Sequence, residues 1–97
     1  MGEESASFAG QVEVFDRPGG WHYVAVPEDL TRRFGQLADR GLIAVDAQVG
    51  SRTWPTSLLP MGDGTHFLAL PAAVRRAEHL QLGDQVEVAI VPRQRAT

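Results

Sequence analysis

Two histidines, His22 and His66, occupy matching positions near the starts of two expected strands. Imidazoles are common metal ligands and proton carriers near neutral pH, so a facing pair would suit a metal site or acid–base catalysis. A metal ordinarily needs three or four ligands, and no His-x-x-x-His motif or carboxylate cluster accompanies this pair. We therefore expect half-buried histidines held by hydrogen bonds, with no metal site and no catalytic residue.

Two arginine pairs are the strongest candidates for a functional surface. Arg32 and Arg33 lie on one expected short helix, and Arg75 and Arg76 lie on the other. If the two helices are related by symmetry, the pairs form a two-lobed cationic patch that would bind an anion or a nucleic acid. The simpler interpretation is solvated charge paired with nearby carboxylates, which contributes little to stability.

A pocket at the mouth of a β-barrel is a further hypothesis, because such mouths often bind ligands. Most of the large aromatic side chains are expected to fill the barrel or to cover its ends. Asp63 lies between two glycines, where its carboxylate would stabilise a turn and the backbone N–H groups could bind an anion. The pocket hypothesis rests on five residues: Trp21, His22, Trp54, Asp63 and His66.

Several classes of chemistry have no support in the sequence. There is no cysteine, so a thiolate nucleophile and a disulfide framework are excluded. The serines lack the Gly-x-Ser-x-Gly pattern of a hydrolase nucleophile, and neither a phosphate-binding glycine motif nor a dinucleotide fingerprint occurs. We expect no cofactor, and a non-enzymatic role is favoured over an enzymatic one.

The composition indicates one globular domain. The chain has 97 residues, of which 43% are hydrophobic and 7% aromatic, and its net charge is −3. All nine cationic residues are arginine. An acidic balance disfavours nucleic acid as a partner, because phosphate contacts need clustered cations. No apolar run approaches the ~20 residues that cross a bilayer, and the acidic start is unlike a signal peptide, so we expect a cytoplasmic protein with no membrane partner.

Turn signals divide the chain into many short elements. Alternation of apolar and polar residues predicts strands over residues 8–15, 21–26, 42–49, 54–59, 65–70 and 85–91. Pro55 places the fourth of these at a sheet edge or a bulge. Short helices are expected from Pro27, ending near Gly35, and from Pro71 to about Glu78, because proline suits the first helical position. Residues 1–7 are expected to form an arm and residues 93–97 a tail.

The chain contains an internal repeat. The segment His22–Pro27 (HYVAVP) matches His66–Pro71 (HFLALP), 44 positions later. Each half, residues 8–50 and 51–92, therefore reads strand, strand, short helix, strand. Two such units, each with one apolar sheet face, would close on each other as a barrel with pseudo-twofold symmetry. Since both halves lie in one polypeptide, we expect a monomer.

The second half resembles the DNA-binding module of AbrB-type regulators and MazE-type antitoxins. The similarity lies in Leu70-Pro71, in Val74-Arg75 and in the run Leu80–Val88, which contains Gly83-Asp84. In that group two chains form one barrel, whereas this chain carries both halves.

The region of residues 8–92 resembles a narrower bacterial family, domain of unknown function 1905. The most distinctive matching segment is Leu58–Gly64 (LLPMGDG), and the other matching segments are Phe8 with Gly10, Trp21–Pro27, Ile43–Gly50, Val74-Arg75 and Gly83–Val88. The resemblance implies a double-split β-barrel, related in fold to the AbrB group, and implies no activity.

The expected fold is mostly β: a small, partly open barrel of six or seven strands with two short helices. The favoured function is a non-enzymatic binding or accessory module whose partner the sequence does not identify. Two alternatives stay open, a DNA-binding regulator of the AbrB type and a small-ligand-binding barrel or enzyme that uses the barrel mouth.

Overall fold

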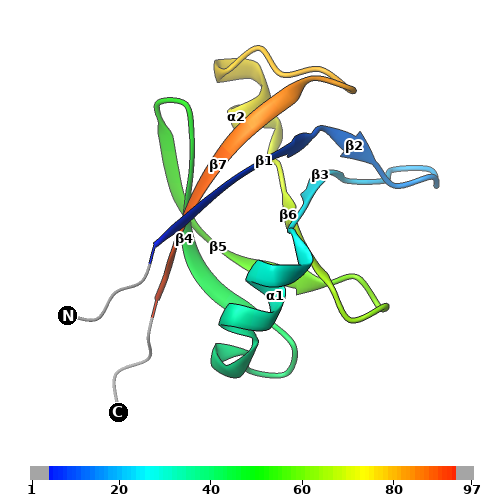
Figure 1. Cartoon of the computed structure of the whole chain (residues 1–97). Coiled ribbons are helices and arrows are strands. Elements are labelled where there is room, and N and C mark those ends of the chain that lie inside the picture. Colours follow the sequence, from blue (N-terminus) through cyan, green and yellow to red (C-terminus); the bar gives the residue numbers. More distant parts are fainter. Residues whose placement is uncertain (1–4, 94–97) are drawn as a thin grey trace.

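The computed structural model describes residues 5–93, and within them the chain forms a seven-stranded, nearly closed antiparallel barrel (Figure 1). The sheet order is β1-β7-β4-β5-β6-β3-β2. The elements are β1 (Ala6–Gln11), β2 (Glu13–Val14), β3 (His22–Ala25), α1 (Glu28–Phe34), η1 (Gly35–Leu37), β4 (Ile43–Val49), β5 (Arg52–Pro60), β6 (His66–Ala69), α2 (Ala72–Ala77) and β7 (Gln85–Pro92). The predicted fold class, a small β-barrel with two short helices, is confirmed.

One interrupted strand closes the barrel. β1 pairs with β7 at one edge of the sheet, and β2 pairs with β3 at the other edge. Between them Val12 is buried, its N–H donates to the Asp84 carbonyl at 2.9 Å, and its own carbonyl accepts the Gly83 N–H at 2.9 Å. The expected single strand over residues 8–15 is therefore broken at Val12, because its first part pairs with β7 and its second part pairs with β3.

The register of β3 and β6 confirms the internal repeat. Val24 lies directly opposite Leu68, which is also its counterpart 44 positions later, so a pseudo-twofold axis passes between them. The backbone hydrogen bonds on either side of this pair are related by the same 44-residue shift. The Val26 N–H donates to the His66 carbonyl at 3.0 Å, and the Leu70 N–H donates to the His22 carbonyl at 2.9 Å.

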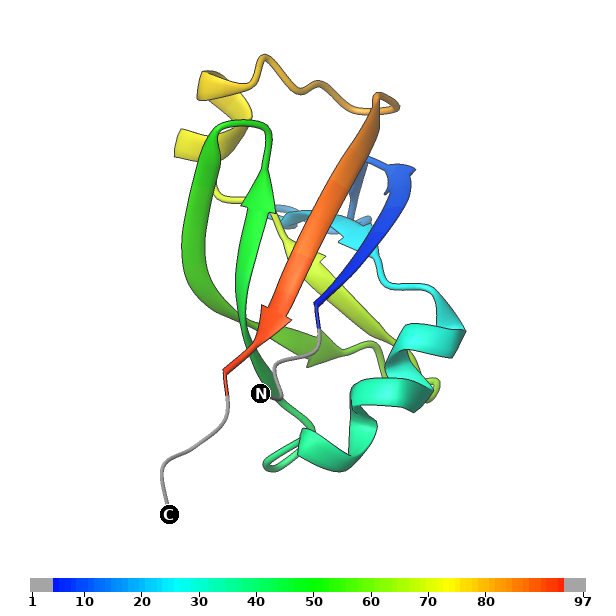
Figure 2. The same cartoon turned by 60° about the vertical axis from the view of Figure 1, so that its left-hand side comes forward.

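A second pair marks the same axis on the opposite wall of the barrel. Ala47 of β4 lies opposite Ile90 of β7, its counterpart 43 positions later. The two helices consequently lie at opposite ends of the barrel, as both views show (Figures 1 and 2). Any feature repeated on α1 and α2 is therefore separated by the length of the barrel.

Three local expectations change in the structure. Ala6 and Ser7, expected in the arm, pair with Ile90 and Ala89 of β7, and Arg93, expected in the tail, bonds to β4. Of the remaining arm and tail positions, Ser5 is exposed and belongs to no strand, and residues 1–4 and 94–97 lie outside the described residues. The strand around Pro55 starts at Arg52, and it pairs with β6 only at its last two residues. Pro55 thus lies on a local edge, as expected.

The barrel interior is mainly aliphatic. It is filled mainly by valine, leucine and isoleucine from the strands, joined by Phe8 and by Leu30 and Phe34 of α1. Trp54 packs against this core from β5, but Tyr23 and Phe67 do not belong to it. Tyr23 and Phe67, which were expected to fill the barrel or to cover its ends, do not fill it, because strand alternation places them on its outer face. Among the described residues, no helix has the length and apolarity needed to span a membrane.

Candidate binding groove

An aromatic cluster covers the outer face of β3 and β6. Tyr23 and Phe67 point outward because their neighbours Val24 and Leu68 point into the core. Phe15, just after β2, stacks on Tyr23 with ring centroids 4.1 Å apart, and it meets Phe67 edge-on at 5.0 Å. Offset stacks and edge-to-face pairs are the favoured geometries for aromatic rings.

The turn between β2 and β3 brings the cluster together. The Phe15 N–H donates to the Trp21 carbonyl at 3.1 Å, which closes the turn. A Cβ on Gly20 would lie 2.2 Å from the Phe15 carbonyl oxygen, so this position requires glycine. The Trp21 ring, 6.4 Å from that of Phe67, is left 56% exposed. The exposed indole of Trp21 therefore lies next to the buried ring of Phe67 and adds an apolar surface to this face.

Two hollows meet at Trp21, and together they are here called the groove. The first, here called the aromatic lobe, has a volume of about 440 Å³. The second, here called the basic lobe, has a volume of about 380 Å³. Both lobes are bordered by Gly19, Gly20 and Trp21; the aromatic lobe adds Phe15, Arg17, Pro60, Met61 and Phe67, and the basic lobe adds His22, Ala69, Leu70, Pro71, Ala72 and Arg75.

The charge of the groove differs from that of the chain. Arg17 lines the aromatic lobe and Arg75 the basic lobe, while neither lobe is lined by an Asp or Glu. The whole chain, by contrast, has twelve acidic and nine basic residues. Arg75 is held in place by its Nε, which donates to the Leu70 carbonyl at 3.1 Å. No other hydrogen bond of the Arg75 side chain is formed with the described residues.

The rim of the cluster has its own polar contact. Glu13 lies opposite Tyr23 in the β2–β3 ladder and accepts a hydrogen bond from the tyrosine hydroxyl. Burial raises the pKa of Tyr23 above its usual value of 10, and the neighbouring Glu13 carboxylate raises it further. The hydroxyl therefore stays protonated throughout the neutral range, and Tyr23 contributes to the aromatic cluster as an uncharged ring.

The structure brings together only part of the predicted pocket. Trp21 and His22 line the groove, and Arg75 from the predicted cationic patch joins them. His66 lies elsewhere, because its carbonyl bonds to Val26 whereas that of His22 bonds to Leu70. Four residues of strand, about 13 Å, therefore separate the two histidines along the β3–β6 ladder. The hypothesis of facing imidazoles is wrong.

Each remaining pocket candidate has a structural role. His66 is buried, and its Nε2 lies 2.9 Å from the Gly41 carbonyl, while Trp54 packs on the core. Asp63 accepts hydrogen bonds from the N–H and the hydroxyl of Thr65, and these bonds lower the pKa of the Asp63 carboxyl. Among the described residues, no three His, Asp or Glu side chains are grouped so that they could hold a metal.

The four arginines of the predicted patch do not share one surface, because α1 and α2 lie at opposite ends of the barrel. Arg32 lies 3.8 Å from Glu28 in an exposed ion pair, and the Arg33 guanidinium lies 5.0 Å from the centre of the Phe34 ring. Arg76 is exposed on α2, next to the anchored Arg75. The single two-lobed patch that symmetry suggested is therefore not formed.

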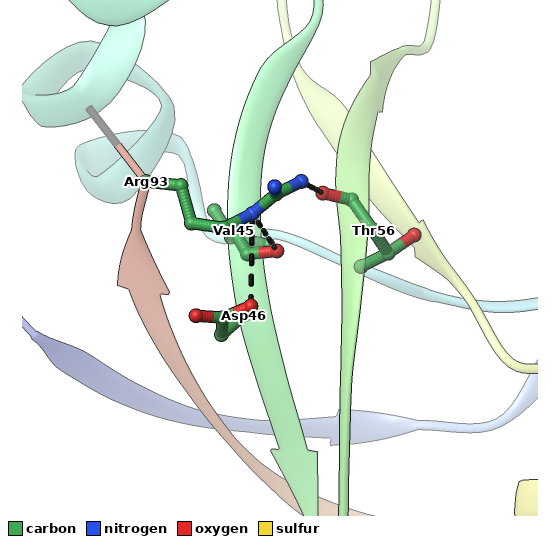
Figure 3. Close-up of polar contacts among 4 residues, drawn as sticks. All are labelled: Val45, Asp46, Thr56 and Arg93. Carbon is green, nitrogen blue, oxygen red and sulfur yellow. Dashed lines mark hydrogen bonds and ion pairs between the residues drawn. The ribbon is translucent and has the colours of Figure 1, made fainter. Parts of the chain in front are cut away.

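A third hollow, of about 550 Å³, lies near α1 and contains Arg93. Its guanidinium is used within the fold: Nε donates to the Val45 carbonyl at 3.2 Å, and Nη2 donates to the Thr56 carbonyl at 3.3 Å (Figure 3). Nε also lies 3.6 Å from the Asp46 carboxylate. These contacts join the end of β7 to β4 and β5 and use the Arg93 guanidinium within the fold, so this hollow is the weaker candidate site.

The comparisons with known proteins give a family. The model of the family described as Domain of unknown function (DUF1905) matches residues 8–90. The chain belongs to this family. A search of curated proteins found no match.

The part of the chain shared with DUF1905 includes every residue that lines the groove, whereas Arg93 lies outside it. Sequence reasoning missed Phe15, Arg17, Pro60 and Met61 as members of the site. A signal for the aromatic face was present, because Val24 and Leu68 face inward and the alternation then requires Tyr23 and Phe67 to face outward. The two turns that bring in the other residues carried no such signal.

Proposed function

We propose that this protein is a non-enzymatic binding module that takes its ligand in the groove around Trp21. One observation carries the proposal: four of the seven aromatic side chains, Phe15, Trp21, Tyr23 and Phe67, are gathered on an outer face of the barrel, where Trp21 stays 56% exposed. Exposing such a ring costs hydrophobic free energy, and exposed apolar surface rimmed by polar groups is typical of a binding site. The lobe volumes of about 440 and 380 Å³ fall within the usual range for small-molecule sites.

The experiment uses the two tryptophans of the chain as separate reporters. In Trp54→Phe only Trp21 remains, and in Trp21→Phe only Trp54 remains. Phenylacetamide, a neutral ring compound, is titrated into both full-length variants while tryptophan emission is recorded. We expect a saturable change for the Trp54→Phe variant, with a midpoint on the order of 1 mM, as befits a ten-atom ligand.

The Trp21→Phe variant is the matched control. Its Trp54 packs against the core on β5 and does not line the groove, so its emission should show no saturable change. Identical, non-saturating quenching in both variants would mean collision with solvent-exposed protein in general, and the proposal would be withdrawn.

The position of the arginines supports this choice over an AbrB-like DNA-binding regulator. Duplex affinity depends on several phosphates being contacted at once, which needs cations on one surface. Here Arg32 and Arg33 belong to one end of the barrel, and Arg75 and Arg76 belong to the other.

We also propose that the protein acts as a monomer. β1 and β2 of the same chain pair with β7 and β3, so no second copy is needed to bury the apolar sheet faces. Light scattering after size exclusion should give a mass near 10.6 kDa. A concentration-independent mass of twice that value would indicate strands exchanged between chains.

A further inference from the structure

We propose that the ligand of the groove is a small aromatic carboxylate, with its ring in the aromatic lobe and its carboxylate in the basic lobe. This inference rests on the proposed function, because it names the class of ligand for the same groove. The hollow on one side of Trp21 would bind the ring, and the hollow on the other side would bind the carboxylate.

The first argument is the charge of the groove walls. Two arginines and one histidine line the lobes without any carboxylate among the lining residues, although acids outnumber bases in the chain as a whole. A ligand that carries a negative charge is attracted by such a wall, and a cationic ligand is repelled. Electrostatic complementarity of this kind favours one class of ligand over its neutral analogues.

The second argument is the geometry of Arg75. Its Nε bond to the Leu70 carbonyl, at 3.1 Å, fixes the plane of the guanidinium at the wall of the basic lobe. An anchored guanidinium loses little further side-chain entropy when it binds, and its remaining donors match the two oxygens of a carboxylate. His22 lines the same lobe.

The third argument is the position of Trp21 between the lobes. Gly19, Gly20 and Trp21 border both hollows, so a ring against the indole lies next to the basic lobe. A short spacer is therefore enough to join a ring on one side to a carboxylate on the other. Arylacetates have this shape: one flat ring, one methylene group and one carboxylate.

The experiment compares indole-3-acetate with indole-3-acetamide, which has the same ring and spacer but no charge. Both are titrated into the ¹⁵N-labelled full chain, and the indole N–H signal of Trp21 is followed. We expect the acetate to bind about tenfold more tightly, which is what a hydrogen-bonded charge contributes. Raising the salt concentration from 50 to 500 mM should weaken the binding of the acetate and leave the binding of the acetamide unchanged.

The variants assign the effect to one residue. Arg75→Gln should bring the affinity for the acetate down to that for the acetamide. The matched control is Arg76→Gln, which removes the exposed neighbouring arginine of α2, outside the groove lining, and should keep the tenfold preference. If Arg75→Gln does not fold, the ratio and its salt dependence in the unaltered protein decide the question.

The outcomes separate this inference from the proposed function. Equal affinities for acetate and acetamide, with saturation at Trp21, would overturn the carboxylate assignment and leave the binding groove standing. Failure of both compounds to shift the Trp21 signal would overturn the groove itself. A tenfold preference that survives in Arg75→Gln would overturn the role given to that residue.

Discussion

Replacing Gly10 by valine should lower the free energy of unfolding by about 3 kcal/mol. A Cβ at this position would lie 2.7 Å from Cγ1 of Val24, which is itself fully buried in the core. Gly10 thus lets β1 pass close over β3, where the barrel closes. The extra carbons of valine would push these two strands apart, and urea unfolding followed by circular dichroism measures the loss.

Gly35→Ala is the matched control for this substitution. Gly35 has helical backbone angles, and a Cβ there meets nothing within 4 Å. Alanine should therefore leave stability unchanged or raise it by up to about 1 kcal/mol, since it restricts the unfolded chain. A Gly10→Val protein as stable as the Gly35→Ala protein would contradict the close approach of β1 to β3.

Leu68→Ala should have the largest effect, a loss of about 3–4 kcal/mol. Leu68 has no exposed surface, and it lies opposite Val24 at the pseudo-twofold axis, where both halves of the barrel contribute to the same layer of the core. The cavity left by the leucine side chain cannot collapse easily, because strands fix the backbone on both sides. The same unfolding measurement applies.

Leu82→Ala provides the comparison for Leu68. Leu82 lies in the loop before β7 and is 61% exposed, so removing its side chain should change stability by no more than about 0.5 kcal/mol. Similar losses for the two leucines would mean that the core does not centre on the β3–β6 pair.

The fold could be predicted because its main signals are local or repeated. Alternation in 42–49 and 85–91 predicts strands that the structure confirms within one or two residues. The 44-residue shift between His22–Pro27 and His66–Pro71 carries more information, because two equivalent strands that pair antiparallel must meet at equivalent residues. The opposition of Val24 to Leu68 follows from that symmetry.

The site could be predicted only in part, because it depends on which loops and helix ends the folded barrel brings together. Trp21, His22 and Arg75 were candidates for separate reasons, and only the folded chain places the β2–β3 turn beside the start of α2. The folded barrel also separates Arg32 from Arg76, because α1 and α2 lie at its opposite ends, although the two arginines occupy equivalent positions in the repeat. The contacts of Arg93 could not be predicted either, because its partners Val45 and Thr56 lie 48 and 37 positions away in the sequence.

The most direct test of a binding site around Trp21 is a residue-resolved map of ligand contacts in solution. Indole-3-acetate is titrated into the ¹⁵N-labelled full chain, and backbone shift changes are assigned along the sequence. We predict that the changes concentrate at residues 15–23, 60–67 and 69–75, with silent signals around Leu37 and Leu42 at the α1 end. Changes centred on the hollow beside Arg93, with silent signals from Gly19 to His22, would contradict the proposed site.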